Sequence, residues 1–378
     1  MRILSIIGTR PEAVKMAPVI QILAQTNGVE SLVCVTAQHR EMLDQVLTLF
    51  EIKPDVDLNL MKPNQSLAQI TASIFTELDP VLTRLQPDWI LAQGDTTTVM
   101  ATALLAHYHH IKFGHVEAGL RTGDKFQPFP EEVNRRIASI AADLHFAPTQ
   151  TSRLNLLKEN IPDEQIIVTG NPVIDALKQV AVRETPDEIK QLLDSLGINP
   201  VVNSRLLLVT AHRRENFGQP LKNICLALKS LAEVYDDLEI VYPVHLNPNV
   251  QNIVYPLLDK IPNITLIPPL DYLPMVHLMK HATIVLTDSG GLQEEAPGLG
   301  VPVLVMRDVT ERPEGLAAGT VRLVGTNPMK IIAETKRLLD NPEEHQKMAQ
   351  AVNPYGDGRA ASRIVQAILG YNQGNQKD

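Results

Sequence analysis

Short apolar runs alternate with longer stretches of helical periodicity from the first residues of the chain to about residue 170. A short apolar run bounded by turn residues is typical of a buried strand, and an apolar repeat of about 3.6 residues is typical of a core-facing helix. Strands are predicted at residues 3–7, 32–36, 89–92, 112–116, 145–147 and 166–169. Helices are predicted between them, at residues 11–25, 41–50, 67–85, 97–107 and 131–142.

The alternation stops at a charged and polar stretch, residues 180–204, which contains Pro186 and Pro200 and is predicted to be a linker region. A second series of apolar runs follows it. Strands are predicted there at residues 206–210, 239–243, 264–267, 284–287, 303–305 and 320–324. Helices are predicted at residues 221–235, 249–258, 291–297 and 328–339, with a last helix at 359–369.

Alternating strands and helices imply right-handed parallel crossovers, and 378 residues exceed what one hydrophobic core usually supports. The sequence therefore predicts an α/β protein with two Rossmann-like, doubly wound parallel-sheet domains. We predict a first domain at 1–180, a second at 181–352 and a terminal helical segment at 353–378. In such sheets ligands bind beyond the carboxyl ends of the strands, so a ligand is expected in the cleft between the domains.

Charge and composition narrow the functional classes. The net charge is −9, and no run of Lys and Arg resembles the basic face of a nucleic-acid binder. No stretch approaches the about 20 apolar residues of a membrane span, and the first apolar run is too short for a signal peptide. Cys34 and Cys225 lie in apolar contexts typical of core positions. These features predict a cytoplasmic globular protein that binds neither nucleic acid nor membranes.

The junction after the first predicted strand has the sequence GTRPEAVK. Gly8 permits a tight turn, and Pro11 suits the start of a helix. Arg10 and Lys15 then lie near a helix N-terminus, which attracts anions. A plain capped turn with two surface cations explains the same residues equally well.

Four carboxylates lie at the other junctions of the first series. Asp95 follows a strand and suits a helix N-cap as well as a functional role. Glu117 ends a strand, ahead of an irregular Gly-rich segment of a kind that is often functional. Glu131 and Glu132 open a helix, where either one complements the helix dipole. The pattern alone does not separate these structural roles from catalysis.

A histidine and two arginines follow the first strand of the second series. The positive neighbours Arg213 and Arg214 predict a lowered pKa for His212, which would suit a neutral base or a phosphate ligand. A surface charge cluster is the alternative.

The junction TDSGGLQEEAPGLGVP is the most specific signal in the second series. A strand ends, a turn follows and a helix begins, so backbone N–H groups freed by the glycines suit a phosphate. Two acidic residues one turn later suit the hydroxyls of a ribose. The residues are Ser289, Gly290, Gly291, Glu294 and Glu295, and Arg312 lies at the next junction.

Signals for a metal or a standing cofactor are weak. The chain has neither G-x-G-x-x-G nor a Walker loop. Asp55 and Asp57 mimic a metal-binding pair, but no further ligands lie near them in the sequence. The same holds for His107, His109 and His110. We predict structural roles for these residues, and neither metal nor cofactor.

Several long motifs, spread from residue 2 to about 370, resemble those of the non-hydrolysing UDP-N-acetylglucosamine 2-epimerases. They are GTRPEAVKMAP, TAQHREMLDQVL, GDTTT, GHVEAGLRTGD, PFPEEVNR, AHRRENFG, YPVHLNPNV, LTDSGGLQEEAP, RDVTERPEG and NPYGDGRA. The resemblance implies two Rossmann-type domains in a glycosyltransferase-like (GT-B) arrangement, with the last helix packed back on the first domain. It also implies a homodimer.

The family interconverts UDP-N-acetylglucosamine and UDP-N-acetylmannosamine by eliminating UDP to 2-acetamidoglucal and adding it back. This supplies N-acetylmannosamine units for cell-surface polysaccharide. On this sequence, the resemblance implies that Asp95, Glu117 and Glu131 are acid/base carboxylates and that His212 is a catalytic histidine near the diphosphate. The UDP-sugar is expected at Asp95, Glu117 and His212, and at Arg10, Lys15, Leu270, Met275, Ser289, Gly290, Gly291, Glu295 and Arg312.

Some positions depart from the family pattern. Gln93 stands where the family often has histidine, and Leu270 and Met275 replace Gln and Phe near the uracil. Some members bind a second UDP-N-acetylglucosamine as an activator. Gln38, Arg213 and His245 match that pocket, whereas Glu41 and Asn64 replace its Gln and Arg.

Three other functions fit the same pattern. A hydrolysing epimerase would release UDP and free N-acetylmannosamine. A GT-B glycosyltransferase would need an acceptor, and a sugar-nucleotide sensor would bind UDP without turnover. The three carboxylates Asp95, Glu117 and Glu131 argue against a sensor, because a protein that only binds an anion gains nothing from acidic side chains beside a diphosphate.

Overall fold

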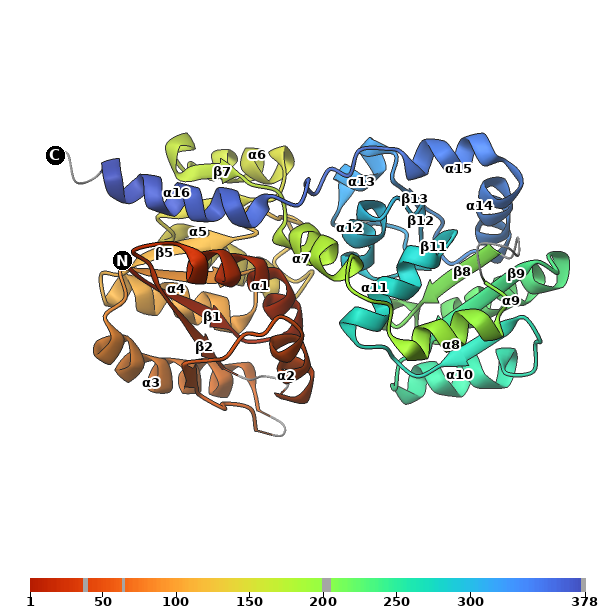
Figure 1. Ribbon diagram of the computed structural model, residues 1–378, viewed down its shortest axis with the longest axis horizontal. Coiled ribbons are helices and arrows are strands. Elements are labelled where there is room, and N and C mark those ends of the chain that lie inside the picture. The colour runs from red at the N-terminus through yellow and green to blue at the C-terminus, as the bar shows by residue number, and fades with distance from the viewer. Residues whose placement is uncertain (37–39, 63–64, 199–204, 375–378) are drawn as a thin grey trace. The chain divides into compact units, whose positions relative to one another are not determined.

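The computed structural model describes residues 1–36, 40–62, 65–198 and 205–374, without the side chains of 40–42 and 372–374. It divides into two compact units, each described separately below (Figure 1). The first unit comprises Met1–Ala176 and Tyr355–Asp378, and the second comprises Leu177–Pro354. The first boundary falls a few residues before the expected position at 180, and the second falls two residues after 352.

A seven-stranded sheet with the order β3-β2-β1-β4-β5-β6-β7 forms the centre of the first unit. All of its strand pairs are parallel. Helices cover both faces of such a sheet, so its central strands are continuous apolar runs. The strands are β1 (Arg2–Ile7), β2 (Glu30–Val35), β3 (Val56–Asp57), β4 (Trp89–Gln93), β5 (Lys112–Val116), β6 (Leu144–Ala147) and β7 (Ile166–Val168).

Four helices of the first unit, α1, α3, α4 and α6, begin at a Ser or Thr N-cap. At the start of α3, the Ser66 Oγ accepts the Gln69 N–H at 3.2 Å, and the Gln69 Oε1 accepts the Ser66 N–H at 2.9 Å. This reciprocal pair is a capping box. The helices are α1 (Arg10–Gln25), α2 (Arg40–Leu49), α3 (Leu67–Leu85), α4 (Thr97–Tyr108), α5 (Glu131–Ala141) and α6 (Gln150–Lys158), with α7 (Pro172–Ala181) leaving the unit.

The last helix, α16 (Ala360–Gly374), belongs to the first unit although the second unit precedes it in the sequence. The Asp175 carboxylate accepts the N–H groups of Ala360 at 3.1 Å and Ala361 at 3.0 Å, which satisfies two donors of the helix N-terminus. The helix packs against α1 (Figure 1). Its Tyr371 ring lies edge-on to Trp89, with 5.3 Å between the centroids.

The second unit repeats the same topology. Its six-stranded sheet has the order β10-β9-β8-β11-β12-β13, again with parallel pairs. The strands are β8 (Arg205–Thr210), β9 (Leu238–Pro243), β10 (Ile264–Ile267), β11 (Ile284–Thr287), β12 (Val303–Val305) and β13 (Val321–Leu323). The helices are α8 (Asp187–Ser195), α9 (Gln219–Val234), α10 (Pro248–Leu258), α11 (Tyr272–His281), α12 (Gly290–Gly298), α13 (Pro313–Ala318), α14 (Pro328–Asp340) and α15 (Pro342–Ala349).

Both sheets confirm the predicted fold class, because each has the strand order of a doubly wound Rossmann-like sheet. The predicted linker at 180–204 is wrong over Asp187–Ser195, which forms α8 with Ile189 and Leu193 buried. The sequence prediction also missed β3 and the helices α6, α7, α11, α13 and α15.

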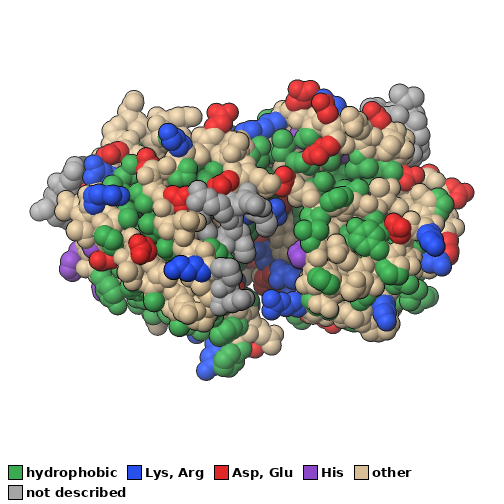
Figure 2. All heavy atoms as spheres, turned by 90° about the horizontal axis from the view of Figure 1, so that it is seen from below, with side chains coloured by type: hydrophobic (Ala, Val, Ile, Leu, Met, Phe, Trp, Pro, Cys, Tyr) green, Lys and Arg blue, Asp and Glu red, His purple; other side chains and the backbone are tan. Residues whose placement is uncertain are grey.

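Each unit has its own hydrophobic core on its sheet. Cys34 and Cys225 are buried and unpaired in these cores, as predicted. Within the part of the chain that the structure describes, no helix is long and apolar enough to cross a bilayer. On the face shown in Figure 2, Lys and Arg side chains are interspersed with Asp and Glu side chains.

Candidate active site

The carboxyl ends of β1, β4 and β5 meet at one edge of the first sheet, where the strand order reverses between β1 and β4. At the end of β1, the Glu12 Oε2 accepts the N–H groups of Gly8 at 2.5 Å and Thr9 at 3.2 Å. A Cβ on Gly8 would lie 2.7 Å from the Thr98 Oγ1, so only glycine fits here. These two amides have an acceptor within the protein, which favours the capped turn over an anion site on them.

Burial raises the pKa of the Glu12 carboxyl to about 7, against weaker opposing hydrogen bonds from Gly8, Thr96 and Thr9. Between its ordinary 4.5 and about 7, the folded chain holds a proton that the unfolded chain has released. Stability therefore falls as the pH rises through this window, by about 3 kcal/mol. Glu12→Gln, which mimics the protonated form, should remove this decline.

Urea unfolding of both proteins at pH 5 and pH 8 checks this expectation. Trp89, the one tryptophan of the chain, is fully buried in the first unit, so its fluorescence reports on that unit. Equal pH dependence in the wild type and Glu12→Gln would contradict it.

Glu117 is 7% exposed and lies directly after β5, in the left-handed backbone region with φ 64°. Its Oε1 accepts the Lys15 Nζ at 2.7 Å and the Asn171 Nδ2 at 2.7 Å. Its Oε2 accepts the Gln93 Nε2. We call Lys15, Gln93 and Asn171 the Glu117 cradle. The donors come from α1, from β4 and from the loop between β7 and α7. Hydrogen bonds of this kind stabilise a carboxylate, which is the form that can remove a proton.

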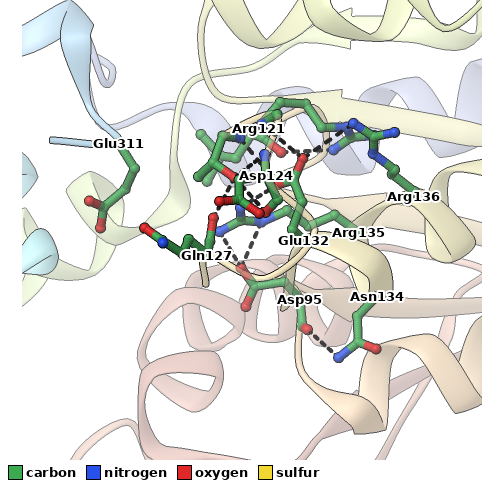
Figure 3. A network of polar contacts seen from close by, with 12 residues as sticks. Asp95, Arg121, Asp124, Gln127, Glu132, Asn134, Arg135, Arg136 and Glu311 are labelled. Carbon is green, nitrogen blue, oxygen red and sulfur yellow. Dashed lines mark hydrogen bonds and ion pairs between the residues drawn. The ribbon is translucent and has the colours of Figure 1, made fainter. Parts of the chain in front are cut away.

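Asp95 does not cap α4, because Thr96 occupies the N-cap and its Oγ1 accepts the Val99 N–H at 3.4 Å. The capping interpretation of Asp95 is therefore wrong. Its Oδ2 instead accepts the Nε of Arg135 at 2.9 Å, and the Arg135 Nη2 lies 2.7 Å from the same oxygen. The Asp95 carbonyl accepts the Asn134 Nδ2 at 2.9 Å (Figure 3).

Glu131 and Glu132, which the helix-dipole pattern alone could not distinguish, have different environments. The Glu132 side chain is fully buried and accepts the N–H of Thr122 at 3.1 Å and of Gly123 at 3.2 Å. It also accepts the Arg135 Nη1 at 3.0 Å, so it braces the partner of Asp95 (Figure 3). Glu131 is partly exposed, and its buried Oε2 has no hydrogen-bond partner among the residues that the structure describes. Glu132 is structural, and Glu131 is left available for chemistry.

In the second unit, Asp288 organises the carboxyl end of β8. It is fully buried and directly follows β11. Its Oδ2 accepts the N–H groups of His212 and Arg213, each at 2.8 Å, and the Asn216 Nδ2 at 3.0 Å. The His212 Nδ1 lies 3.6 Å from the Asp288 Oδ1, and the His212 ring stacks on His245 with 5.4 Å between centroids.

The predicted lowering of the His212 pKa is confirmed, but its cause is different. Burial of the imidazole is the main cause, and the charge of Asp288 opposes it. His245 and then Arg213 lower the pKa further, while Arg214 lies in a short 3-10 turn. The imidazole is thus biased toward its neutral form, which can donate one hydrogen bond and accept another.

The turn after β11 leads into α12, with Ser289 at the N-cap and no hydrogen bond from its side chain to the helix. A Cβ on Gly290 would lie 2.8 Å from the Arg312 Nη1, so glycine here lets the guanidinium approach the helix N-terminus. Arg312 donates from Nε to Glu294 and from Nη1 to the Glu311 Oε1 at 2.8 Å. The turn at Gly290 and the guanidinium of Arg312, which two carboxylates hold in place, therefore lie next to each other.

Glu294 and Glu295 have different partners in the structure. Glu294 pairs with Arg312, whereas the Glu295 Oε1 accepts the Tyr272 hydroxyl at 3.0 Å. Burial, and then the charge of Glu295, raise the pKa of Tyr272 well above its usual value, so this hydroxyl keeps its proton. Leu270 precedes α11 and Met275 lies on it, both half-buried.

For the remaining predicted residues, the structure gives fewer contacts with the rest of the site. Arg10 is the first residue of α1 and is half-buried. Among the activator-pocket residues, the Arg213 Nη2 is 3.9 Å from the Glu311 Oε1, and His245 stacks on His212. Gln38, Asn64 and the side chain of Glu41 lie outside the described residues.

Asp55 and Asp57 have backbone partners: the Asp55 Oδ2 accepts the Val33 N–H at 2.8 Å, and the Asp57 Oδ1 accepts the Asn59 N–H at 3.1 Å. The His109 Nε2 lies 2.7 Å from the Asp79 Oδ1. Over residues 1–36, 40–62, 65–198 and 205–374, no group of three His, Cys, Asp or Glu side chains could hold a metal ion.

Four residues with central contacts were not predicted: Asn171, Arg135, Asp288 and Tyr272. Asn171 and Asp288 follow β7 and β11 closely, so the rule that ligands bind beyond strand ends covers both. Arg135 and Tyr272 lie on helices, and no sequence signal separates them from other helical residues.

Two doubly wound units with charged residues beyond the central strands define an α/β protein of the glycosyltransferase-like (GT-B) class. The family model described as UDP-N-acetylglucosamine 2-epimerase matches residues 21–369. The chain belongs to this family.

Its relatives match over nearly their whole length. The UDP-N-acetylglucosamine 2-epimerase of Salmonella typhimurium is 55% identical, over 98% of this chain and 99% of that protein. The crystal structure of the Neisseria meningitidis enzyme bound to UDP-GlcNAc has a TM-score of 0.89 at 52% identity, covering 98% of this chain and 100% of that one. The Methanocaldococcus jannaschii enzyme in complex with UDP-GlcNAc and UDP has a TM-score of 0.82 at 34% identity, with coverage of 98% and 100%.

Proposed function

We propose that the protein is a non-hydrolysing epimerase that interconverts UDP-N-acetylglucosamine and UDP-N-acetylmannosamine at C2. The Glu117 cradle carries this proposal, because it directs three hydrogen-bond donors at a buried carboxyl group at the carboxyl end of β5. Asp95 follows the adjacent strand β4, and Glu131 opens α5. A protein that only bound a nucleotide would gain nothing from these acids.

The reaction needs proton transfer at a carbon that is not next to a carbonyl. Elimination avoids direct formation of a carbanion: the C2–H proton goes to a carboxylate, the C1–O bond breaks, and UDP leaves with the bonding electrons. This gives 2-acetamidoglucal. UDP then adds back at C1 while a protonated carboxyl group delivers a proton to the other face of C2. Acid/base residues on both faces are required, and a typical one contributes about 10²- to 10⁴-fold to the rate.

Departure of UDP leaves negative charge on the diphosphate, which fixed donors and cations stabilise. In the second unit, we assign this role to the turn at Ser289, Gly290 and Gly291, to Arg312 and to neutral His212. Glu295, oriented by Tyr272, is assigned to the ribose, and Leu270 and Met275 to the uracil. Arg10 and Lys15 are assigned to the diphosphate from the first unit. Because the Lys15 Nζ lies 2.7 Å from Glu117, this assignment requires the ammonium to be shared between the two groups.

The remaining parts of the proposal rest on the family resemblance. They are a homodimer, a cytoplasmic location, a second UDP-N-acetylglucosamine as activator, and a supply of N-acetylmannosamine units for cell-surface polysaccharide. Of the activator pocket, Arg213 and His245 are described, and they belong to the same unit as His212.

Incubation with UDP-N-acetylglucosamine in heavy water, followed by proton NMR, tests the proposal. Both epimers should appear, each with deuterium at C2, because solvent exchanges with the carboxyl proton. Absence of both deuterium and UDP-N-acetylmannosamine would overturn it. Release of free UDP in proportion to N-acetylmannosamine would instead show a hydrolysing epimerase.

A further inference from the structure

We infer that Gln93 is a positioning residue for the proton-transfer step, acting by orienting the Glu117 carboxylate. This inference rests on the proposed function. Gln93 is the last residue of β4 and is 3% exposed. It is the one polar residue in the otherwise apolar, buried strand WILAQ.

The backbone brings the two residues together. Gln93 pairs with Val116 across the β4–β5 ladder, and the Gly94 N–H donates to the Val116 carbonyl at 3.0 Å. Glu117 follows Val116 and turns with φ 64°, and Gly94 beside it turns with φ 90°. This places the Gln93 Nε2 against the Glu117 Oε2. The contact assigns the amide orientation, because a carboxylate only accepts and the NH₂ group must face it.

The hydrogen bond from Gln93 acts on Oε2, the second oxygen of the Glu117 carboxylate. Lys15 and Asn171 both donate to Oε1, each at 2.7 Å. With Lys15 and Asn171 on Oε1, the Gln93 amide helps to fix where Oε2 points, and so the direction in which Glu117 presents a lone pair or a proton. Without the amide, the carboxylate can rotate away from the reacting geometry, and its ionised form loses a donor.

The other charged groups around Glu117 do not replace this role. Lys15 of α1 contributes a fixed positive charge at Oε1. Burial lowers the pKa of His115 of β5 to about 3, so it stays neutral while it donates to the Gly94 carbonyl at 2.7 Å. Asp95, after β4, is paired with Arg135. Gln93 does not titrate, so its hydrogen bond persists across the working pH range.

Gln93→Leu tests the inference, with kcat and KM measured across pH. We expect kcat to fall by about tenfold to a hundredfold, as for loss of one donor to a buried charged group. KM should change little, because Gln93 is assigned no contact with the substrate. The acid limb of the kcat profile should move to higher pH, because the ionised form of Glu117 has lost a donor.

Gln93→His is the conservative variant. Its imidazole N–H restores a donor, so part of the lost kcat should return. It also adds a group that titrates near neutrality, so the profile should gain a limb between about pH 5 and 8. Gln21→Leu is the matched control: Gln21 is half-buried on α1 and its Nε2 donates to the Phe50 carbonyl at 2.9 Å, away from the cradle. It should keep the wild-type profile.

A Gln93→Leu protein with wild-type kcat and an unmoved acid limb would overturn the inference. So would a loss of kcat that parallels thermal destabilisation and leaves the acid limb in place, because that pattern is purely structural. The wild-type protein separates the two proposals. Absence of wild-type epimerisation overturns the proposed function and this inference with it, whereas normal wild-type turnover with an unaffected Gln93→Leu overturns only the inference.

Discussion

Glu117→Gln should lower kcat by about 10²- to 10⁴-fold, the usual contribution of a general acid or base. Glutamine has nearly the shape of glutamate but cannot take up a proton. The change also leaves the Lys15 ammonium, whose side chain is 14% exposed, beside a neutral amide. Deuterium incorporation at C2 and the rate of epimer formation measure the effect, with circular dichroism to show that the fold is retained.

Asp163→Asn is a suitable control for this experiment. It removes one member of an ion pair in the same unit, in which the Arg153 Nη2 lies 2.6 Å from the Asp163 Oδ2 at a partly exposed position. Turnover should stay at the wild-type level, because an exposed pair contributes about 1 kcal/mol or less. If Glu117→Gln kept more than half of the wild-type kcat, another residue would have to carry the proton transfer.

Glu131→Gln should mainly lower the catalytic rate, whereas Glu132→Gln should mainly lower the stability of the fold, although the two residues are neighbours. Glu131→Gln should lower kcat by about 10²- to 10⁴-fold without loss of stability, because its carboxylate is assigned to acid/base catalysis. Glu132→Gln should destabilise the first unit by about 1–3 kcal/mol, because it weakens the hydrogen bonds of a buried carboxylate to two amides and to Arg135, while Arg135 keeps its pair with Asp95. Urea unfolding followed by Trp89 fluorescence measures the stability, and NMR measures the turnover.

Each of these variants is the control for the other, since the same chemical change is made one residue apart. Glu132→Gln should also lose some activity, because Arg135 holds Asp95. That loss should shrink when the assay temperature is lowered. Equal loss of stability in both variants would show that Glu131 is structural as well.

The fold was largely predictable because parallel strands buried on both faces appear as apolar runs. β4 and β5 are examples, and their bounds matched the prediction within one residue. β3 has only two residues, Val56 and Asp57, so it carries no periodic signal. The helix α6 has the mostly polar sequence QTSRLNLLK, and α8 buries only Ile189 and Leu193 on one face. Tertiary contacts, rather than local pattern, stabilise such elements.

The site was predictable only as far as strand ends reveal it. That rule located Asp95, Glu117 and His212, and the family resemblance assigned them roles. The rule could not separate Glu131 from Glu132. The difference lies in the amides of Thr122 and Gly123, which belong to an irregular segment about ten residues earlier that only the folded structure brings to Glu132. The local charge pattern around His212 predicted the right pKa direction, but burial, which depends on the whole unit, is the larger cause.

The docking of α16 has a consequence for synthesis of the chain. A ribosome releases residues 1–176 well before residues 355–374, so the nascent first unit waits with the α1 surface that α16 covers still exposed to solvent. The Asp175 carboxylate likewise lacks its hydrogen bonds from the N–H groups of Ala360 and Ala361 until that segment has been synthesised. The second unit, a continuous segment, can complete its fold first. For this chain the usual order of N-terminal domain first is reversed at the final step.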